Sequence, residues 1–259
     1  MTADAAAGPL VSWTRTLNED DALALLDAAR PGMPLPEWEA AGDGLLPQPS
    51  RPRRRETIRM VRDELLDHDG AAVAGSTFLR LLAGSPHRRS TLLRARLHVR
   101  RAWVTRALDE LVAPALAAAE APLAPTAAAA IPAAAWAAFV DRHVAPPTPP
   151  SARQKTRSTL QTTLARLGVV TLDTARDRGA VAHRAEPEAL AFGWLLLDEL
   201  RATGRAEAPA SWAGTDSLAA RLFLPRPDWA ARCVDAAVSA GLLREGYLAG
   251  ASRLHPGEA

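Results

Sequence analysis

Cysteine is almost missing from this chain of 259 residues, in which Cys233 is the only one. A disulfide within the chain is therefore excluded, and so is a zinc site built from cysteine clusters. Long apolar runs are missing too: no stretch reaches about 18 residues without a charge, and the first residues lack the pattern of a secretion signal. We expect a protein of the reducing cytoplasm that neither spans nor enters a membrane.

Signatures of catalysis are equally scarce. The chain has no GxSxG, no Walker glycine loop with Lys-Ser/Thr, no HExxH and no GxGxxG. The six histidines stand singly, and only His68 has adjacent carboxylates, from Asp67 and Asp69. A histidine in a charged turn usually lies at the surface rather than on a metal. We therefore expect no enzymatic activity, no metal and no cofactor.

The net charge is only +2, but the charges are unevenly distributed along the chain. Residues 1–50 carry 2 basic and 8 acidic side chains, whereas residues 51–106 carry 14 and 5, and residues 151–184 carry 7 and 2. All cations of the two basic segments are arginine except Lys155, and the planar guanidinium group of arginine binds phosphate oxygens in pairs. Because GC-rich codon use also favours arginine, the clustering rather than the arginine content indicates a polyanionic partner.

Apolar spacing predicts a mostly helical protein of four consecutive sections. The first, residues 1–50, would hold one capped helix at its centre and a linker rich in proline and glycine over 31–50. The second, residues 51–145, would be a helical domain. Its expected helices run over 52–69, over 76–82, over 90–112 up to Pro114, and around Trp136 and Phe139.

The third and fourth sections, residues 146–186 and 187–259, each place a helix before a β-hairpin. In the third, a helix over 152–167 precedes a change of apolar period from 3.6 to 2. A helix followed by a small hairpin is the second half of a winged helix-turn-helix, so we expect two winged units. The remaining elements are predicted as strands over 169–172 and 180–183, helices over 187–203, 217–224 and 229–240, and strands over 242–244 and 251–254.

The first winged unit carries residue types that bind DNA. Its helix is expected to direct cations, hydroxyls and an amide away from a leucine stripe, where they can bind phosphates and groove edges. The alternative is a solvated helix that packs internally or binds protein. The expected DNA-binding residues are Arg153, Lys155, Arg157 and Arg166, with Ser158, Thr159, Gln161, Thr162 and Thr163 between them, and Arg176 and Arg178 on the hairpin.

The first basic segment offers a second set of candidate cations, Arg53, Arg54, Arg55, Arg88, Arg89 and Arg94. Ordinary salt bridges such as Arg59–Asp63 are the alternative there. Few acidic residues lie near 88–106 in the sequence, which makes that alternative weaker for the long helix. The second winged unit is nearly neutral, which favours a structural or partner-binding role. We expect the cations of both basic segments to form one surface that attracts duplex DNA.

In this order, the segments resemble the BrxA family of BREX phage-defence systems over residues 50–185. The similar blocks are Glu56-Thr-Ile-Arg, STFLRLLAGSPHRRS over 76–90, the 92–112 helix, Ala135-Trp-Ala-Ala-Phe139, SARQKTRSTL over 151–160, and Leu167-Gly168. The resemblance implies a helical N-terminal domain, a winged C-terminal region, double-stranded DNA binding without known enzymatic activity, and action beside methyltransferase and ATPase components. A winged-helix transcription regulator and a scaffold joining defence proteins are the alternatives.

Overall fold

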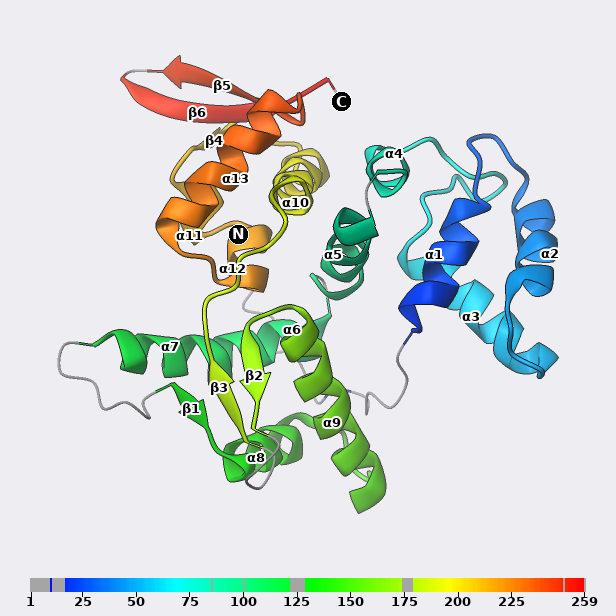
Figure 1. The fold of residues 1–259 in the computed structure, drawn as a ribbon, viewed down its shortest axis with the longest axis horizontal. Coiled ribbons are helices and arrows are strands. Elements are labelled where there is room, and N and C mark those ends of the chain that lie inside the picture. The colour runs from blue at the N-terminus through cyan, green and yellow to red at the C-terminus, as the bar shows by residue number, and fades with distance from the viewer. Residues whose placement is uncertain are drawn as a thin grey trace. The chain divides into compact units, whose positions relative to one another are not determined.

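The computed structural model describes Leu10 and residues 17–84, 86–99, 101–121, 129–173, 179–248 and 250–258, leaving aside the side chains of residues 86–88 (Figure 1). The protein is mostly helical and has small antiparallel sheets, as the sequence predicts. The chain divides into two compact units, neither of which is continuous in sequence. Unit 1 consists mainly of residues 98–187 and 209–232, and unit 2 of residues 16–97, 188–208 and 233–259. These units cut across the four consecutive sections expected from the sequence.

Residues 17–74, the N-terminal segment, contain the helices α1 (Glu19–Asp27), α2 (Leu35–Leu45) and α3 (Arg51–Glu64). The expected linker over 31–50 is wrong, because α2 occupies most of it. Prolines are tolerated in the first turn of a helix, and Pro36 lies there. Gly42 allows close packing, since a Cβ atom at this position would lie 2.6 Å from Leu25 Cδ2. Pro36 and Gly42, which locally indicate a loop, thus belong to a packed helix.

A tight hairpin follows α3. Pro34 forms an antiparallel bridge with Ala72, and His68 forms another with Val73. Asp69 Oδ1 accepts hydrogen bonds from the backbone N–H groups of Ala71 and Ala72, both at 2.8 Å. These two donors lower the pKa of the Asp69 carboxyl, because they stabilise its charged form. The turn is therefore held by local hydrogen bonds, and the buried Leu66 and Val73 anchor its two sides in the core.

The long helix predicted over 90–112 is interrupted. Helix α4 (Thr77–Leu82) begins as expected, with Ser76 Oγ accepting the N–H of Leu79, and α5 follows at Pro86–His98. The chain then leaves helical geometry, and Arg101 is the extended N-cap of the next helix. That helix passes Pro114 instead of ending there, because a wider π-helical turn precedes the proline and relieves its clash with the preceding turn. Its parts are α6 (Ala102–Ala107), the π-helical turn η1 (Leu108–Val112) and α7 (Ala113–Glu120).

Residues 102–182, the middle segment, confirm the expected helix and hairpin. Its three-stranded sheet has the order β1-β3-β2 and is antiparallel throughout. Trp136, Leu160 and Leu164 are fully buried, and the rings of Trp103 and Phe139 meet edge to face at 6.0 Å. This core fixes the helices that carry these residues against one another. The elements after α7 are β1 (Ala130–Ile131), α8 (Ala133–His143), α9 (Pro150–Arg166), β2 (Val170–Leu172) and β3 (Ala180–Ala182).

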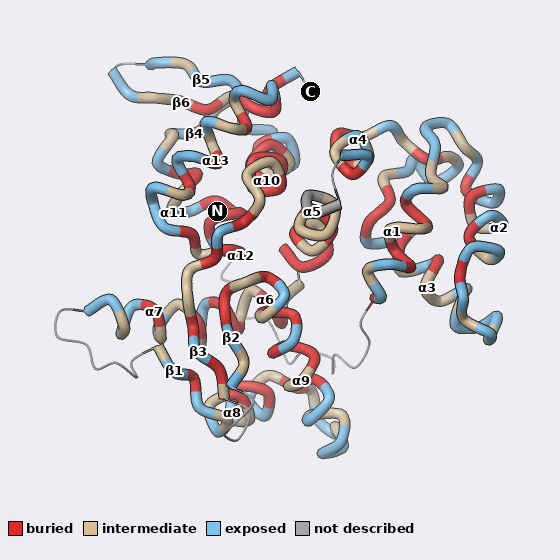
Figure 2. The backbone as a smooth tube through the Cα atoms, in the orientation of Figure 1, coloured by how far each residue is buried: buried red, intermediate tan, exposed pale blue. Residues whose placement is uncertain are grey.

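Residues 189–256, the C-terminal segment, also place a helix before a hairpin, as the sequence predicts. Its sheet has the order β4-β6-β5, and α10 is buried along most of its length (Figure 2). Gly193 of α10 lies against Ala237, whose Cβ would be 2.3 Å from a Cβ at the glycine. The elements are α10 (Ala189–Ala202), β4 (Ala208–Pro209), α11 (Trp212–Thr215), α12 (Leu218–Phe223), α13 (Pro227–Ser239), β5 (Leu243–Leu248) and β6 (Ala251–Pro256).

The three segments thus share one order of elements: a helix, a short strand, further helices and a hairpin. In each segment, the short strand or bridge that follows the first helix pairs with the last strand of the hairpin. In the N-terminal segment this pairing is reduced to single bridges at Pro34, His68 and their partners. The sequence predicts the hairpins of the other two segments but not this one, because its strands are too short to show a period of two.

Candidate nucleic-acid interface

Helix α9 carries the main candidate site. It packs against α6 and α8 and leads into β2, so its position is fixed by the core of the middle segment. The helix bears four cations and no aspartate or glutamate. Because no carboxylate lies on the helix itself, any neutralising partner must come from another element.

The helix is more deeply buried than the sequence predicts. Thr159, Gln161 and Thr163 are buried, so the expectation that they face DNA is wrong. The leucine stripe is narrow, and short polar side chains complete the packed face of the helix in its place. Lys155 and Arg166 are exposed as expected. Arg153 and Arg157 are only partly exposed and line a cavity against α8. The expectation that all four cations point away from the leucine stripe is therefore wrong, because Arg153 and Arg157 lie on the same face of the helix as Leu160 and Leu164.

Arg153 and Arg157 line a cavity of about 490 Å³ between α8 and α9. Arg153 forms an ion pair with Asp141 of α8 at 2.9 Å, and its Nε–H donates to the carbonyl of Thr148 at 3.2 Å. The Nε atom of Arg157 is buried, and no described group accepts its hydrogen bond. A buried donor without an acceptor is costly, and a phosphate oxygen would satisfy it. Gln154, which the sequence does not single out, lines the same cavity.

The hairpin cations cannot be placed in the same way, since Arg176 and Arg178 lie outside the described residues. Nearby, Arg184 forms a two-pronged ion pair with Glu120, at 2.5 and 2.7 Å. The guanidinium group lowers the pKa of Glu120, and the carboxylate in turn raises the pKa of Arg184. Arg184 also donates to the carbonyl of Pro225 at 3.2 Å. This arginine therefore stabilises the fold of unit 1.

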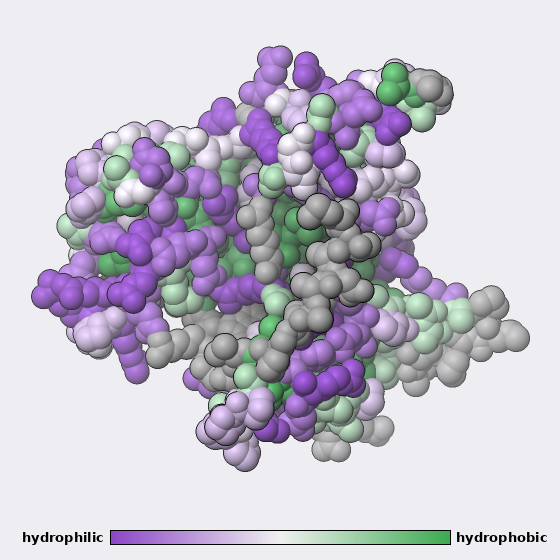
Figure 3. All heavy atoms as spheres, turned by 180° about the vertical axis from the view of Figure 1, so that it is seen from behind, coloured by the Kyte–Doolittle hydropathy of each residue, from purple (hydrophilic) through white to green (hydrophobic). Residues whose placement is uncertain are grey.

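Helix α3 presents a second basic surface, in unit 2. Arg53, Arg55 and Arg59 are exposed, and the described carboxylates form no ion pair with any of them. Arg54 differs, because its Nε–H binds Asp43 at 2.9 Å and lowers the pKa of that carboxyl. Hydrophilic side chains cover most of the N-terminal segment in the view of Figure 3.

The neighbouring carboxylate Asp63 pairs with Arg62 at 2.8 Å, so the salt bridge Arg59–Asp63, the alternative to phosphate binding, is not formed. Arg59 lies one helical turn after Arg55, and that spacing could have identified it as part of the basic surface.

The arginines of α5 whose side chains the structure describes are neutralised. Arg89 pairs with Asp27, and Arg94 binds both carboxylate oxygens of Glu19 at 2.8 and 2.9 Å. Arg96 pairs with Asp67, which lies between α3 and α4. The expectation that this strip lacks acidic partners is wrong, because α1 supplies them from more than 60 residues away. The Arg88 side chain is outside the described residues. Of the candidate cations that the structure describes, Arg53 and Arg55 of α3 and Lys155 and Arg166 of α9 are the exposed ones.

Over the described ranges, no helix is long and apolar enough to cross a membrane. Comparison of the chain with protein-family models, with curated proteins and with solved structures finds no match.

Proposed function

We propose that this protein is a non-enzymatic component of a BREX-type phage-defence system that binds duplex DNA mainly through its phosphates. The order of elements in the middle segment supports a winged helix: helix, strand, two helices and a hairpin, with β1 beside β3. In helix-turn-helix proteins, the second of the paired helices enters the major groove. That position belongs to α9.

The observation that carries this proposal is the charge of α9. Four cations share a helix that bears no carboxylate. In the part of the chain that the structure describes, neither Lys155 nor Arg157 has an ion pair, and the buried Nε–H of Arg157 has no acceptor. Phosphate oxygens would provide both the acceptor and the counter-charge. The burial of Thr159, Gln161 and Thr163 leaves few groups for base recognition, which favours binding with weak sequence preference.

The role in phage defence rests on the resemblance to the BrxA family, and BREX methyltransferase or ATPase components are the partners that it suggests. The C-terminal segment suits such a partner better than DNA. Its helix α13 is nearly neutral, and Tyr247 and Leu248 are exposed near the end of the hairpin. A scaffold that joins defence proteins through this segment is therefore the second candidate function.

Fluorescence anisotropy with two unrelated 30-base-pair duplexes at rising salt concentration tests the proposal. We expect similar affinity for both duplexes, and log affinity that falls with log salt by about 0.9 for each phosphate neutralised. Preference for one operator by several orders of magnitude would instead indicate a transcription regulator. No binding to either duplex at low salt would leave the scaffold as the better function.

A further inference from the structure

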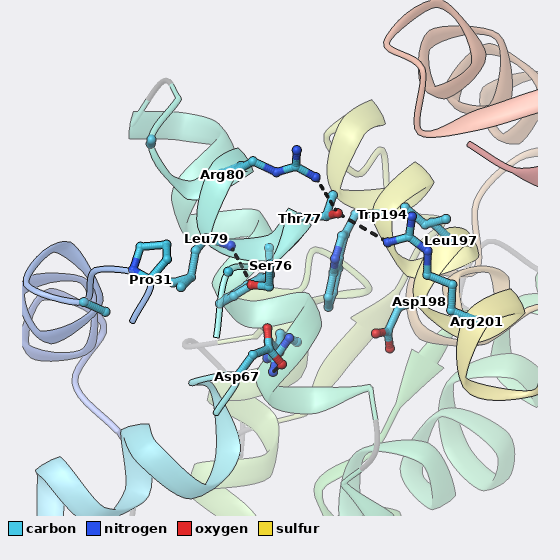
Figure 4. Close-up of a pocket in the computed structure, with 15 residues that line it drawn as sticks. Pro31, Asp67, Ser76, Thr77, Leu79, Arg80, Trp194, Leu197, Asp198 and Arg201 are labelled. Carbon is cyan, nitrogen blue, oxygen red and sulfur yellow. Dashed lines mark hydrogen bonds and ion pairs between the residues drawn. The ribbon is translucent and has the colours of Figure 1, made fainter. Parts of the chain in front are cut away.

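A cavity of about 890 Å³ lies in unit 2, and the proposed DNA contacts of α9 do not use it. Its wall is formed by α4 and the residues before it, by Arg96 of α5 and by α10 from Trp194 to Arg201 (Figure 4). Pro31, which follows α1, lies at the edge. The volume is within the range of about 300 to 1,000 Å³ that is usual for small-molecule sites.

One of the three arginines in this wall, Arg96, is held by a carboxylate. Arg96 Nη2 lies 2.5 Å from a carboxylate oxygen of Asp67. Its guanidinium carbon is 4.5 Å from the ring centroid of Phe78 and 5.8 Å from that of Trp194. Because this cation is held by a carboxylate and two aromatic faces, it shapes the wall and keeps the rings covered. The rings themselves are nearly fully buried.

The other two arginines converge on one point. Arg80 Nη2 and Arg201 Nη1 both donate to Thr77 Oγ1, at 3.1 and 3.4 Å, from α4 and α10 (Figure 4). Both side chains belong to exposed residues, and the described carboxylates form no ion pair with Arg80. Arg201 Nη2 also donates to the carbonyl of Gly257 at 3.2 Å. A phosphate between the two guanidinium groups would be attracted by both of them. Their planar donors match the oxygens of a phosphate.

The rest of the wall is complementary to the remainder of a phosphorylated ligand. Pro31 and Leu79 offer apolar contacts, and the wall also contains the carboxylates of Asp67, which pairs with Arg96, and of Asp198. Carboxylate oxygens are acceptors for hydroxyl or amino groups. We propose that this cavity binds a mononucleotide, with its phosphate between Arg80 and Arg201, its sugar hydroxyls toward the carboxylates and its base against the apolar wall. The proposal does not depend on DNA binding by α9.

Isothermal titration calorimetry with AMP, GMP, CMP and UMP, each alone, tests the site on the full chain. At least one nucleotide should bind more tightly than inorganic phosphate and than its own nucleoside, because both halves of the ligand contact the wall. Arg80→Gln should weaken that binding about tenfold or more, since a charge-assisted hydrogen bond is lost. Arg205→Gln is the matched control: it removes the same charge from an exposed residue that does not line the cavity, and binding should not change.

Three results would overturn the proposal. The first is that none of the four nucleotides binds the wild type. The second is that R80Q binds as tightly as the wild type while retaining its circular dichroism spectrum and melting temperature. The third is that inorganic phosphate binds as tightly as every nucleotide, which would show a simple anion site. In the first case, a loss of duplex DNA affinity in R80Q would show that the cavity belongs to a DNA surface instead.

Discussion

The middle and C-terminal segments have the same sheet order and both place a helix directly before a hairpin, yet these two helices, α9 and α13, differ in charge. Helix α9 carries four cations and no acid. Helix α13 carries Asp228 and Asp235 against Arg232, which pairs with Asp228 at 3.3 Å and lies 4.4 Å from the ring centroid of Trp229. The shared topology puts a helix in the same position twice, and the side chains decide whether that helix attracts a polyanion.

The largest effect is expected for DNA binding by α9. Replacing Arg153, Lys155 and Arg157 together with Gln should weaken binding to unrelated duplexes about 100-fold at 0.1 M salt, and should lower the salt slope by about 2 to 3. Replacing Arg226, Arg232 and Arg244 with Gln removes the same charge from the C-terminal segment and should change affinity much less. Anisotropy measures both variants. Equal losses would show that net charge, rather than α9, controls binding.

A second effect is expected from the packing of the C-terminal segment, which a steric change can test. Gly193→Ala places a Cβ 2.3 Å from that of Ala237 and should destabilise the protein by about 1 to 3 kcal/mol, because α10 must shift. The double variant with Ala237→Gly should recover part of this loss. Urea unfolding measures both. Unchanged stability of the single variant would show that α10 and α13 are packed less closely.

A gain of function should follow if charge is what distinguishes the two helices. Asp235 is exposed on α13, and Asp235→Arg should strengthen duplex binding roughly fivefold at 50 mM salt by adding a phosphate contact. Glu186→Arg makes the same charge change outside the helix and serves as the control. An equal gain in both variants, measured by anisotropy, would contradict a role for the helix position.

The smallest effect is expected at the ion pair between Arg184 and Glu120. Arg184 lowers the folded-state pKa of Glu120, so the pair stabilises the protein above the usual glutamate pKa, about 4.3, and this stabilisation is lost as the pH falls through the lowered value. Because Glu120 is half exposed, Glu120→Gln should cost only about 0.5 kcal/mol at pH 7. The difference from the wild type should vanish on acidification, as measured by denaturation at several pH values. A difference that grows at low pH would reverse the sign assigned here. Affinity for DNA should stay unchanged.

Elements with strong local signals are predictable from the sequence. Ser76 caps α4, and the change of period after α9 marks β2 and β3. Helix α2 cannot be predicted in the same way, because proline and glycine both end helices and begin or pack them, and only the contact between Gly42 and Leu25 distinguishes these uses. The break between α5 and α6 has no local signal, because the apolar spacing continues through it.

The cations of this chain, their concentration in two segments and their position on α9 follow from the sequence alone, because charge and helical spacing are local properties. Which cations remain available is decided by the tertiary structure. Arg89 and Arg94 are neutralised by acids of α1 more than 60 residues away, and Arg201 reaches the hydroxyl of Thr77, which also binds Arg80, from 124 residues along the chain. Electrostatic interactions act through space over a few ångströms, so their partners cannot be identified from spacing along the chain.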